Sequence, residues 1–155
     1  MEIEGIRQVK VPVSDLQRSV DWYRKAFGLR LGWEFVEDGE VAGAVLTDEG
    51  STFLIGLRRR DVVPGEPAFV GFDLFSLSVG SVEALEALAK RLDDLGIAHD
   101  PPFDRGPGGG VHLDVPDPDG TVVRILTPFG EPAQFSGVEF HPDGPPTFYE
   151  TPRLT

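Results

Sequence analysis

The 155-residue chain contains no cysteine, and this absence removes several chemistries at once. Disulfide bridges, thiolate nucleophiles, iron–sulfur clusters and cysteine-ligated zinc all need the missing side chain. Histidine is also scarce, with 3 in the whole chain. A metal site would therefore have to combine those few imidazoles with carboxylates.

Positive charge is the next shortage, because 14 basic residues face 26 acidic ones and leave a net charge of −12. Such a chain is repelled by nucleic acid and by anionic membranes, so we expect neither as a partner. No apolar run approaches the ~20 residues that span a bilayer, and the first residues lack a signal-peptide pattern. These absences make the cytoplasm the expected compartment.

Glycine and proline, in contrast, are abundant, with 19 and 14 copies. This share is high for a folded domain but falls short of a low-complexity composition. With 40% hydrophobic residues, a chain of this length can bury a core without covalent cross-links. We therefore expect a loop-rich globular domain.

The first half of the chain reads as a strand, a helix and three further strands. Residues 6–13 alternate apolar and polar side chains, as in a half-buried strand. Ser14 and Gln17 form a capping-box pattern that predicts a helix start, and Gly28 predicts its end. Further strands are expected at 31–35, 41–47 and 52–57, separated by Asp- and Gly-rich turns.

The second half repeats this order. A strand at 75–79 precedes a helix that Ser81 can cap and Gly96 can end, and strands follow at 97–99, 111–115 and 121–127. Such a duplication predicts an α+β fold of tandem βαβββ modules. We expect the two halves to pair into one cupped mixed sheet, with both helices on its outer face.

These patterns suggest a single domain over residues 1–127, followed by a tail. Module one covers about 6–57, a linker 58–71 and module two about 72–127. The tail, 128–155, is rich in proline but also in aromatic residues, which disordered tails rarely carry. We expect it to be irregular and docked on the body or on a partner subunit.

Two segments resemble the vicinal oxygen chelate superfamily, which includes glyoxalases, bleomycin-resistance proteins and dioxygenases. They are the run Val9–Tyr23, continued by Phe27-Gly28-Leu29, and the run Asp117-Pro118-Asp119-Gly120-Thr121-Val122-Val123-Arg124-Ile125. The resemblance implies paired βαβββ modules around a small-molecule cavity, commonly in a homodimer. Because the superfamily spans lyases, oxygenases, transferases and plain binders, it does not by itself specify the chemistry.

The resemblance also implies four positions where metal-dependent members hold an ion. They fall on Gln8, Gly56, Leu74 and Arg124. Glycine and leucine offer no side-chain donor, and a cationic guanidinium cannot coordinate a cation. We therefore expect no metal and no other cofactor. A one-residue slip would place Asp73 at the third position, but the alternation of the following strand favours Leu74.

Strand alternation also predicts which side chains face the cavity. We expect ligand contacts from the following residues: Gln8, Lys10, Trp33, Arg58, Ser76 and Arg124. His112 and Asp114 lie two apart on one strand face and can converge on the same ligand. In the alternative, Arg124 pairs with Asp114, while Lys10 and Arg58 reach solvent. A weaker hypothesis makes His141 a general base, and His99 is expected at the surface.

Two functions from different classes fit these residues. The first is a metal-free protein that binds a small anionic or aromatic metabolite or antibiotic, as bleomycin-resistance proteins do. The alternative is a glyoxalase-like lyase or isomerase, or a dioxygenase. A third interpretation is a structural or regulatory domain whose cup is filled by its own tail. Metal content and the response of the melting temperature to a chelator separate the first two.

Overall fold

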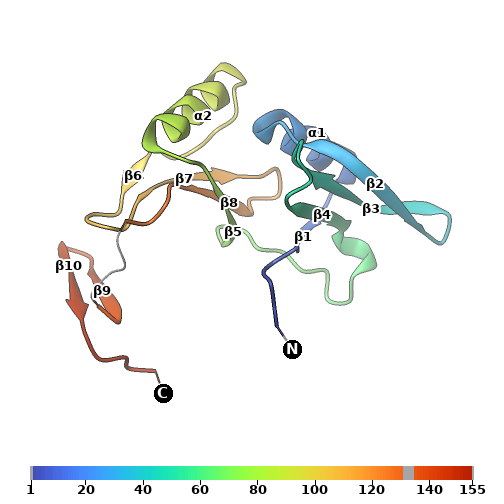
Figure 1. Ribbon diagram of the computed structural model, residues 1–155. Helices are drawn as coiled ribbons and strands as arrows, with labels where there is room; N and C mark the ends of the chain where they lie inside the picture. Colours follow the sequence, from blue (N-terminus) through green and yellow to red (C-terminus); the bar gives the residue numbers. More distant parts are fainter. Residues whose placement is uncertain (1, 131–134, 155) are drawn as a thin grey trace.

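The computed structural model describes residues 2–130 and 135–154, and its body consists of two βαβββ modules (Figure 1). The first module comprises β1 (Gln8–Val13), α1 (Leu16–Phe27), β2 (Arg30–Glu37), β3 (Glu40–Thr47) and β4 (Leu54–Arg59). The second comprises β5 (Asp73–Ser78), α2 (Val82–Asp94), β6 (Phe103–Asp104), β7 (Val111–Pro116) and β8 (Val122–Leu126). The predicted α+β class and tandem repetition are confirmed. Neither α1 nor α2 is long and apolar enough to cross a membrane.

Both helices begin at a side-chain cap. Asp15 caps α1 by accepting a hydrogen bond from the Arg18 amide at 3.0 Å, and Ser81 caps α2 through the Ala84 amide at 3.2 Å. The prediction of Ser14 as the first cap was wrong by one residue. Gly28 ends α1 with a φ of 68°, in the left-handed conformation that glycine adopts without strain.

The strands of each module form a four-stranded sheet with one face covered by helix. Their orders are β1-β4-β3-β2 and β5-β8-β7-β6, with β1/β4 and β5/β8 parallel and the other pairs antiparallel. The covered faces carry aliphatic side chains that alternate with the predicted cavity-facing residues, all at most 1% exposed: Val11, Ile55, Leu57, Val123 and Ile125. This confirms the predicted alternation for β1, β4 and β8.

The sequence predicts one continuous sheet, but the two modules form separate sheets. Within the described residues β1 and β5 are edge strands, each hydrogen-bonded to its own module alone. The modules instead meet through a shared core and through polar contacts of α1 and of the residue before its cap. Tyr23 Oη donates to Asp117 Oδ2 at 3.0 Å, and the Ser14 amide donates to Asp119 Oδ2 at 3.1 Å. These contacts hold the two modules together, while the outer edges of β1 and β5 stay unpaired in the described part of the chain.

Two connecting regions also differ from the prediction. The expected strand at 97–99 is absent, and the short strand β6 lies farther along the chain. A prolyl residue donates no amide hydrogen, so the pair Pro101-Pro102 delays strand pairing to Phe103. In the predicted linker, β4 extends to Arg59 and a 3₁₀ turn, η1, follows at Arg60–Val62.

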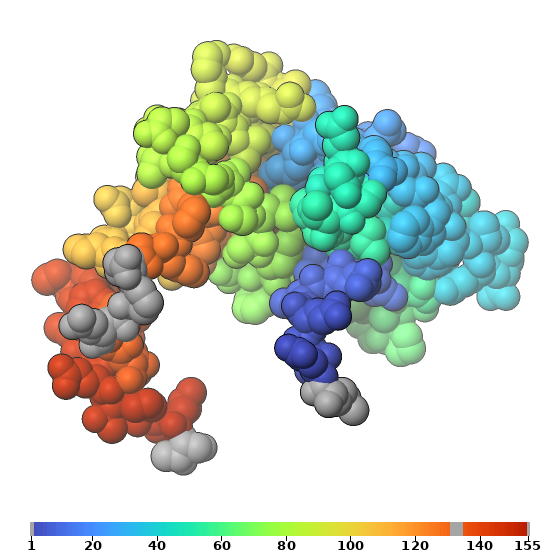
Figure 2. All heavy atoms as spheres, in the orientation of Figure 1, coloured from blue at the N-terminus to red at the C-terminus, as the bar shows by residue number. Residues whose placement is uncertain are grey.

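The C-terminal tail is not irregular but forms an antiparallel hairpin, β9 (Gly137–His141) and β10 (Gly144–Tyr149). Pro145 and Pro146 fit in β10 because both strands of a two-stranded sheet are edges. The hairpin projects from the second module on the side opposite the helices (Figures 1 and 2). Phe140 and Phe148 are 73% and 52% exposed, so these aromatics are not docked on the body.

Candidate functional site

The sheet faces that no helix covers hold most of the predicted site residues. Registered strand pairs place Lys10 opposite Gly56, Gly56 opposite Val45 and Val45 opposite Trp33. Residues opposite one another in a sheet point to the same side. Lys10 and Trp33 therefore share one face of the first module.

Arg58 lies on the same face but is engaged within the module. Its guanidinium forms a 2.8 Å ion pair with Glu37 and lies 5.5 Å from the centroid of the Phe35 ring. The ring of Phe35 covers Gly43, where an added Cβ would lie only 2.0 Å from it. Arg58, Glu37 and Phe35 thus form one stacked cluster, and neither Glu37 nor Phe35 was predicted.

The resemblance implies a metal-ligand position at Gly56, and in the structure neighbouring side chains fill the space beside this glycine. A Cβ at Gly56 would lie 2.8 Å from Gln8 Nε2 and 3.3 Å from Lys10 Cγ. The Gln8 amide and the Lys10 stem therefore lie across the glycine. The glycine is buried although it faces the open side of the sheet.

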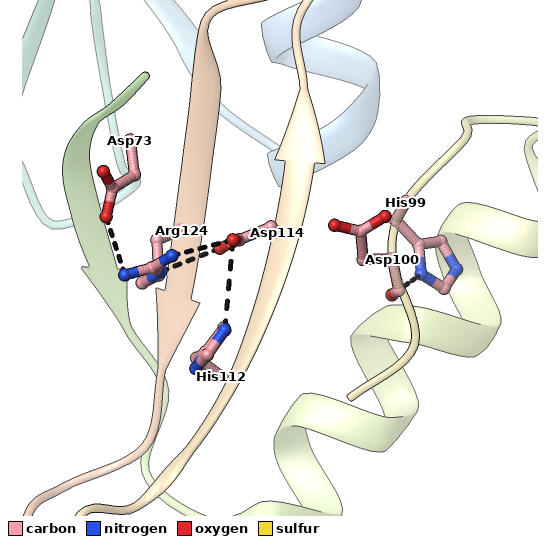
Figure 3. A network of polar contacts seen from close by, with 6 residues as sticks. All are labelled: Asp73, His99, Asp100, His112, Asp114 and Arg124. Carbon is pink, nitrogen blue, oxygen red and sulfur yellow. Dashed lines mark hydrogen bonds and ion pairs between the residues drawn. The ribbon is translucent and has the colours of Figure 1, made fainter. Parts of the chain in front are cut away.

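The second module carries a polar network centred on Arg124 (Figure 3). Arg124 Nε and Nη2 donate to the two oxygens of Asp114, each at 2.8 Å, and Nη1 pairs with Asp73 Oδ2 at 2.6 Å. Three strands, β5, β7 and β8, bring these groups together. The prediction left two roles open for Arg124, ligand contact or pairing with Asp114. In the structure Arg124 pairs with Asp114.

Asp73 was set aside in the sequence prediction in favour of Leu74, and this was wrong. A register shift between Asp73 and Phe75 in the β5/β8 pair allows the Asp73 carboxylate to reach the Arg124 face. Leu74 instead packs against the core. Regular alternation cannot reveal such a bulge, because the shift depends on how β5 aligns with β8.

The electrostatics of the network follow from these contacts. The hydrogen bonds from Arg124 hold the pKa of Asp114 below its usual range, and the same bonds raise the pKa of Arg124. Burial and the nearby Arg124 charge lower the pKa of His112, so its imidazole is neutral at pH 7. At this pH the network holds two carboxylates and one guanidinium.

His112 extends this network toward an exposed aromatic side chain. Its Nε2 lies 3.9 Å from Asp114 Oδ2, and its ring centroid lies 5.2 Å from that of Phe103 on the paired strand β6. Within the described residues, His112 Nδ1 is buried and has no hydrogen-bond partner. Phe103 is 59% exposed, so the row of side chains ends in an accessible ring. Sequence analysis missed Phe103.

A cleft of about 900 Å³ lies between the two modules, along the open edges of β1 and β5. Gln8 and Ser76, both predicted to contact a ligand, line it together with mainly apolar residues: Phe27, Leu74, Phe75, Leu77 and Leu88. The predicted site residues thus fall in three places. Gln8 and Ser76 line the cleft, Lys10, Trp33 and Arg58 lie on the first module, and His112, Asp114 and Arg124 form the network of the second.

The tandem modules and their polar, helix-free faces define a class of protein. The chain belongs to the Glyoxalase/Bleomycin resistance protein/Dioxygenase superfamily, whose sequence profile matches residues 5–125. This is the vicinal oxygen chelate fold that the sequence resembled. No curated protein matches the chain.

Solved structures share the fold at low sequence identity. A glyoxylase/bleomycin resistance protein/dioxygenase domain from Frankia sp. EAN1pec is 24% identical, with a TM-score of 0.68 over 86% of this chain and 97% of that one. The antibiotic-binding protein TnmS3 from Streptomyces sp. CB03234 is 23% identical, with a TM-score of 0.65 over 83% and 98%. Lactoylglutathione lyase from Agrobacterium tumefaciens is 18% identical, with a TM-score of 0.64 over 82% and 96%.

The residues present do not fit the metal centre that the superfamily implies. Gly56 has no side-chain donor atom, and at the fourth position the guanidinium of Arg124 lies between the carboxylates of Asp73 and Asp114. In residues 2–130 and 135–154, no three His, Asp or Glu side chains are grouped as ligands for one ion. The two carboxylates nearest this position, Asp73 and Asp114, are both ion-paired with Arg124.

Proposed function

We propose that this protein binds a small polar aromatic molecule on the helix-free sheet faces, without a metal ion. The observation that carries the proposal is the ion pairing of Arg124, a side-chain cation at the position where the resemblance implies a metal ligand. A guanidinium bonded to Asp73 and Asp114 at 2.6–2.8 Å leaves no room for an ion between them. The similarity in fold to TnmS3, an antibiotic-binding protein, is consistent with this proposal.

The aromatic preference follows from the exposed rings on these faces. Trp33 is 51% exposed on the first module and Phe103 is 59% exposed on the second. Flat aromatic surfaces favour stacking with an aromatic ligand, and nearby polar groups fix its orientation. Gln8, Lys10 and Ser76 supply such groups on β1 and β5, while His112 and Asp114 supply them on β7.

We further propose that the protein works as a homodimer. The open edges of β1 and β5 expose backbone hydrogen-bonding groups beside an apolar cleft. Unpaired strand edges and exposed apolar clefts are typical of surfaces that another chain covers. A second copy seated there would also bring a second pair of Gln8 and Ser76 side chains to the cleft.

Metal analysis of the purified protein tests the proposal directly. We expect no stoichiometric nickel, zinc, manganese or iron, and no change in melting temperature with added metal or chelator. The matched variant Arg124→His places an imidazole beside Asp73, Asp114 and His112, and it is expected to gain metal-dependent stabilisation. Stoichiometric metal in the wild-type protein, lost with chelator together with stability, would overturn the proposal in favour of a glyoxalase-like lyase or a dioxygenase.

Ligand binding is the second part of the test. Trp33 lies exposed on the proposed face, so its fluorescence is expected to change when an aromatic compound binds. A Trp33→Phe variant serves as the control that separates this signal from that of Trp22, which packs against Phe27. If small aromatic compounds cause no saturable change in fluorescence or melting temperature, the binding function is wrong.

A further inference from the structure

We infer that the ligand presents a nitrogen-bound hydrogen, as in an amine, amidine or amide, to Asp73, rather than a carboxylate to Arg124. This inference rests on the proposed function and specifies the chemistry of that ligand. It follows from the pairing with Asp114, which is one of the two roles that the sequence left open for Arg124. The reason lies in how the hydrogen-bonding capacity of the network is used.

Arg124 is committed to protein acceptors. Three of its nitrogen atoms contact carboxylate oxygens, two on Asp114 and one on Asp73. Its side chain is 23% exposed, so the charge lies mostly below the surface of the sheet. An anion approaching Arg124 would come close to both carboxylates, and like charges at that distance repel. The guanidinium therefore organises the two acids rather than the ligand.

Asp73 has the opposite character. It contacts Arg124 through Oδ2, whereas no described residue donates a hydrogen bond to its Oδ1. Its side chain is 41% exposed, more than twice the 18% of Asp114. Asp73 therefore offers a half-exposed acceptor held in place by one strong ion pair. A charged acceptor that is pre-oriented in this way favours an N–H donor.

The side chains beside the two acids define where the rest of the ligand lies. Phe103, His112, Asp114, Arg124 and Asp73 follow one another across the sheet, from β6 to β5. A planar ring stacked on Phe103 and His112 would direct a substituent toward the carboxylates. The neutral His112 adds no positive charge that would oppose a cationic substituent.

One further cation lies close to this row. Arg105 lowers the pKa of both His112 and Asp114 by its charge, and its guanidinium lies 5.8 Å from the centroid of the Phe129 ring. Because Arg105 forms no ion pair with Asp73 within the described residues, it does not occupy the open acceptor. The charge of Arg105 weakens the preference of the site for a cationic ligand, but it does not change the preference for a ligand that donates a hydrogen bond.

Three probes of the same shape and different charge test the inference. Benzamidine, benzamide and benzoate would be titrated into the full-length wild-type protein and followed by NMR chemical shifts. We expect benzamidine to bind about tenfold more tightly than benzoate, with benzamide between them. The shifts should centre on residues of the row between Phe103 and Asp73.

The variant Asp73→Asn assigns the preference to one residue. We expect it to reduce the benzamidine preference to less than about threefold while benzamide still binds. The control Asp21→Asn, on the outer face of α1, changes the net charge equally and should leave the preference intact. Benzoate binding as tightly as benzamidine, or a preference that survives Asp73→Asn, would overturn the inference. Saturable binding by none of the three probes would overturn the proposed function itself.

Discussion

At the scale of single residues, the most consequential contact joins the two modules through a buried carboxylate. Asp117 accepts hydrogen bonds from Tyr23 Oη and from the amides of Asp119 and Thr121. Burial raises the pKa of Asp117, and burial together with the Asp117 charge raises that of Tyr23. A charged group that is costly to bury is thus retained because three donors satisfy it.

Removing the Tyr23 hydroxyl should weaken the whole domain. Tyr23→Phe leaves Asp117 Oδ2 buried without its partner, so we expect the free energy of unfolding in urea to fall by about 1–3 kcal/mol. Tyr149, the other tyrosine of the chain, provides the control. Tyr149→Phe lies in the projecting hairpin and should change the free energy by less than about 0.5 kcal/mol. Equal effects of the two substitutions would show that the hydroxyl–carboxylate contact contributes little.

At the scale of secondary-structure elements, the C-terminal hairpin has one packed face and one exposed face. On the packed face the ring of Tyr149 lies over Gly137, where a Cβ would clash at 1.9 Å, and the guanidinium of Arg153 lies 4.3 Å from the centroid of that ring. On the exposed face the ring centroids of Phe135 and Phe148 are 4.5 Å apart, and Phe140 is exposed. The hairpin therefore does not fill the hollow of its own chain, contrary to the third interpretation of the sequence.

Truncation after Gly130 tests the independence of this element. The side-chain hydrogen bonds and ion pairs of the described hairpin residues all lie within residues 135–154. We therefore expect the melting temperature of the body to change by less than about 2 °C, since the truncation removes no core packing. A large decrease in a calorimetric scan would show that the hairpin packs against the body or a second subunit in solution.

At the scale of the whole molecule, two open strand edges line an apolar cleft, and the proposed homodimer covers them. We expect light scattering to give a mass of 2 × 16.9 = 33.8 kDa at micromolar concentration. Pairing would also slow hydrogen exchange at amides of β1 and β5 that point away from β4 and β8. A mass of 16.9 kDa with rapid exchange at both edges would contradict the dimer.

Several parts of this architecture follow from local sequence patterns. The alternation in β1 and β8 and the helical spacing in α1 and α2 depend on neighbouring residues, which are visible in the sequence. The stop at Gly28 is equally local, because its left-handed conformation suits glycine. Such features allowed the α+β class, the repeat and the covered face of each module to be predicted correctly.

Contacts between strands could not be predicted from the sequence and became known only from the three-dimensional structure. The bulge that brings Asp73 to Arg124, the separation of β1 from β5 and the hairpin in the tail all depend on how distant segments align. A guanidinium has the same charge whether it faces a ligand or two carboxylates, so residue type could not distinguish the roles of Arg124. Composition and periodicity thus establish the modules, whereas the availability of each polar atom depends on the partners that folding brings to it.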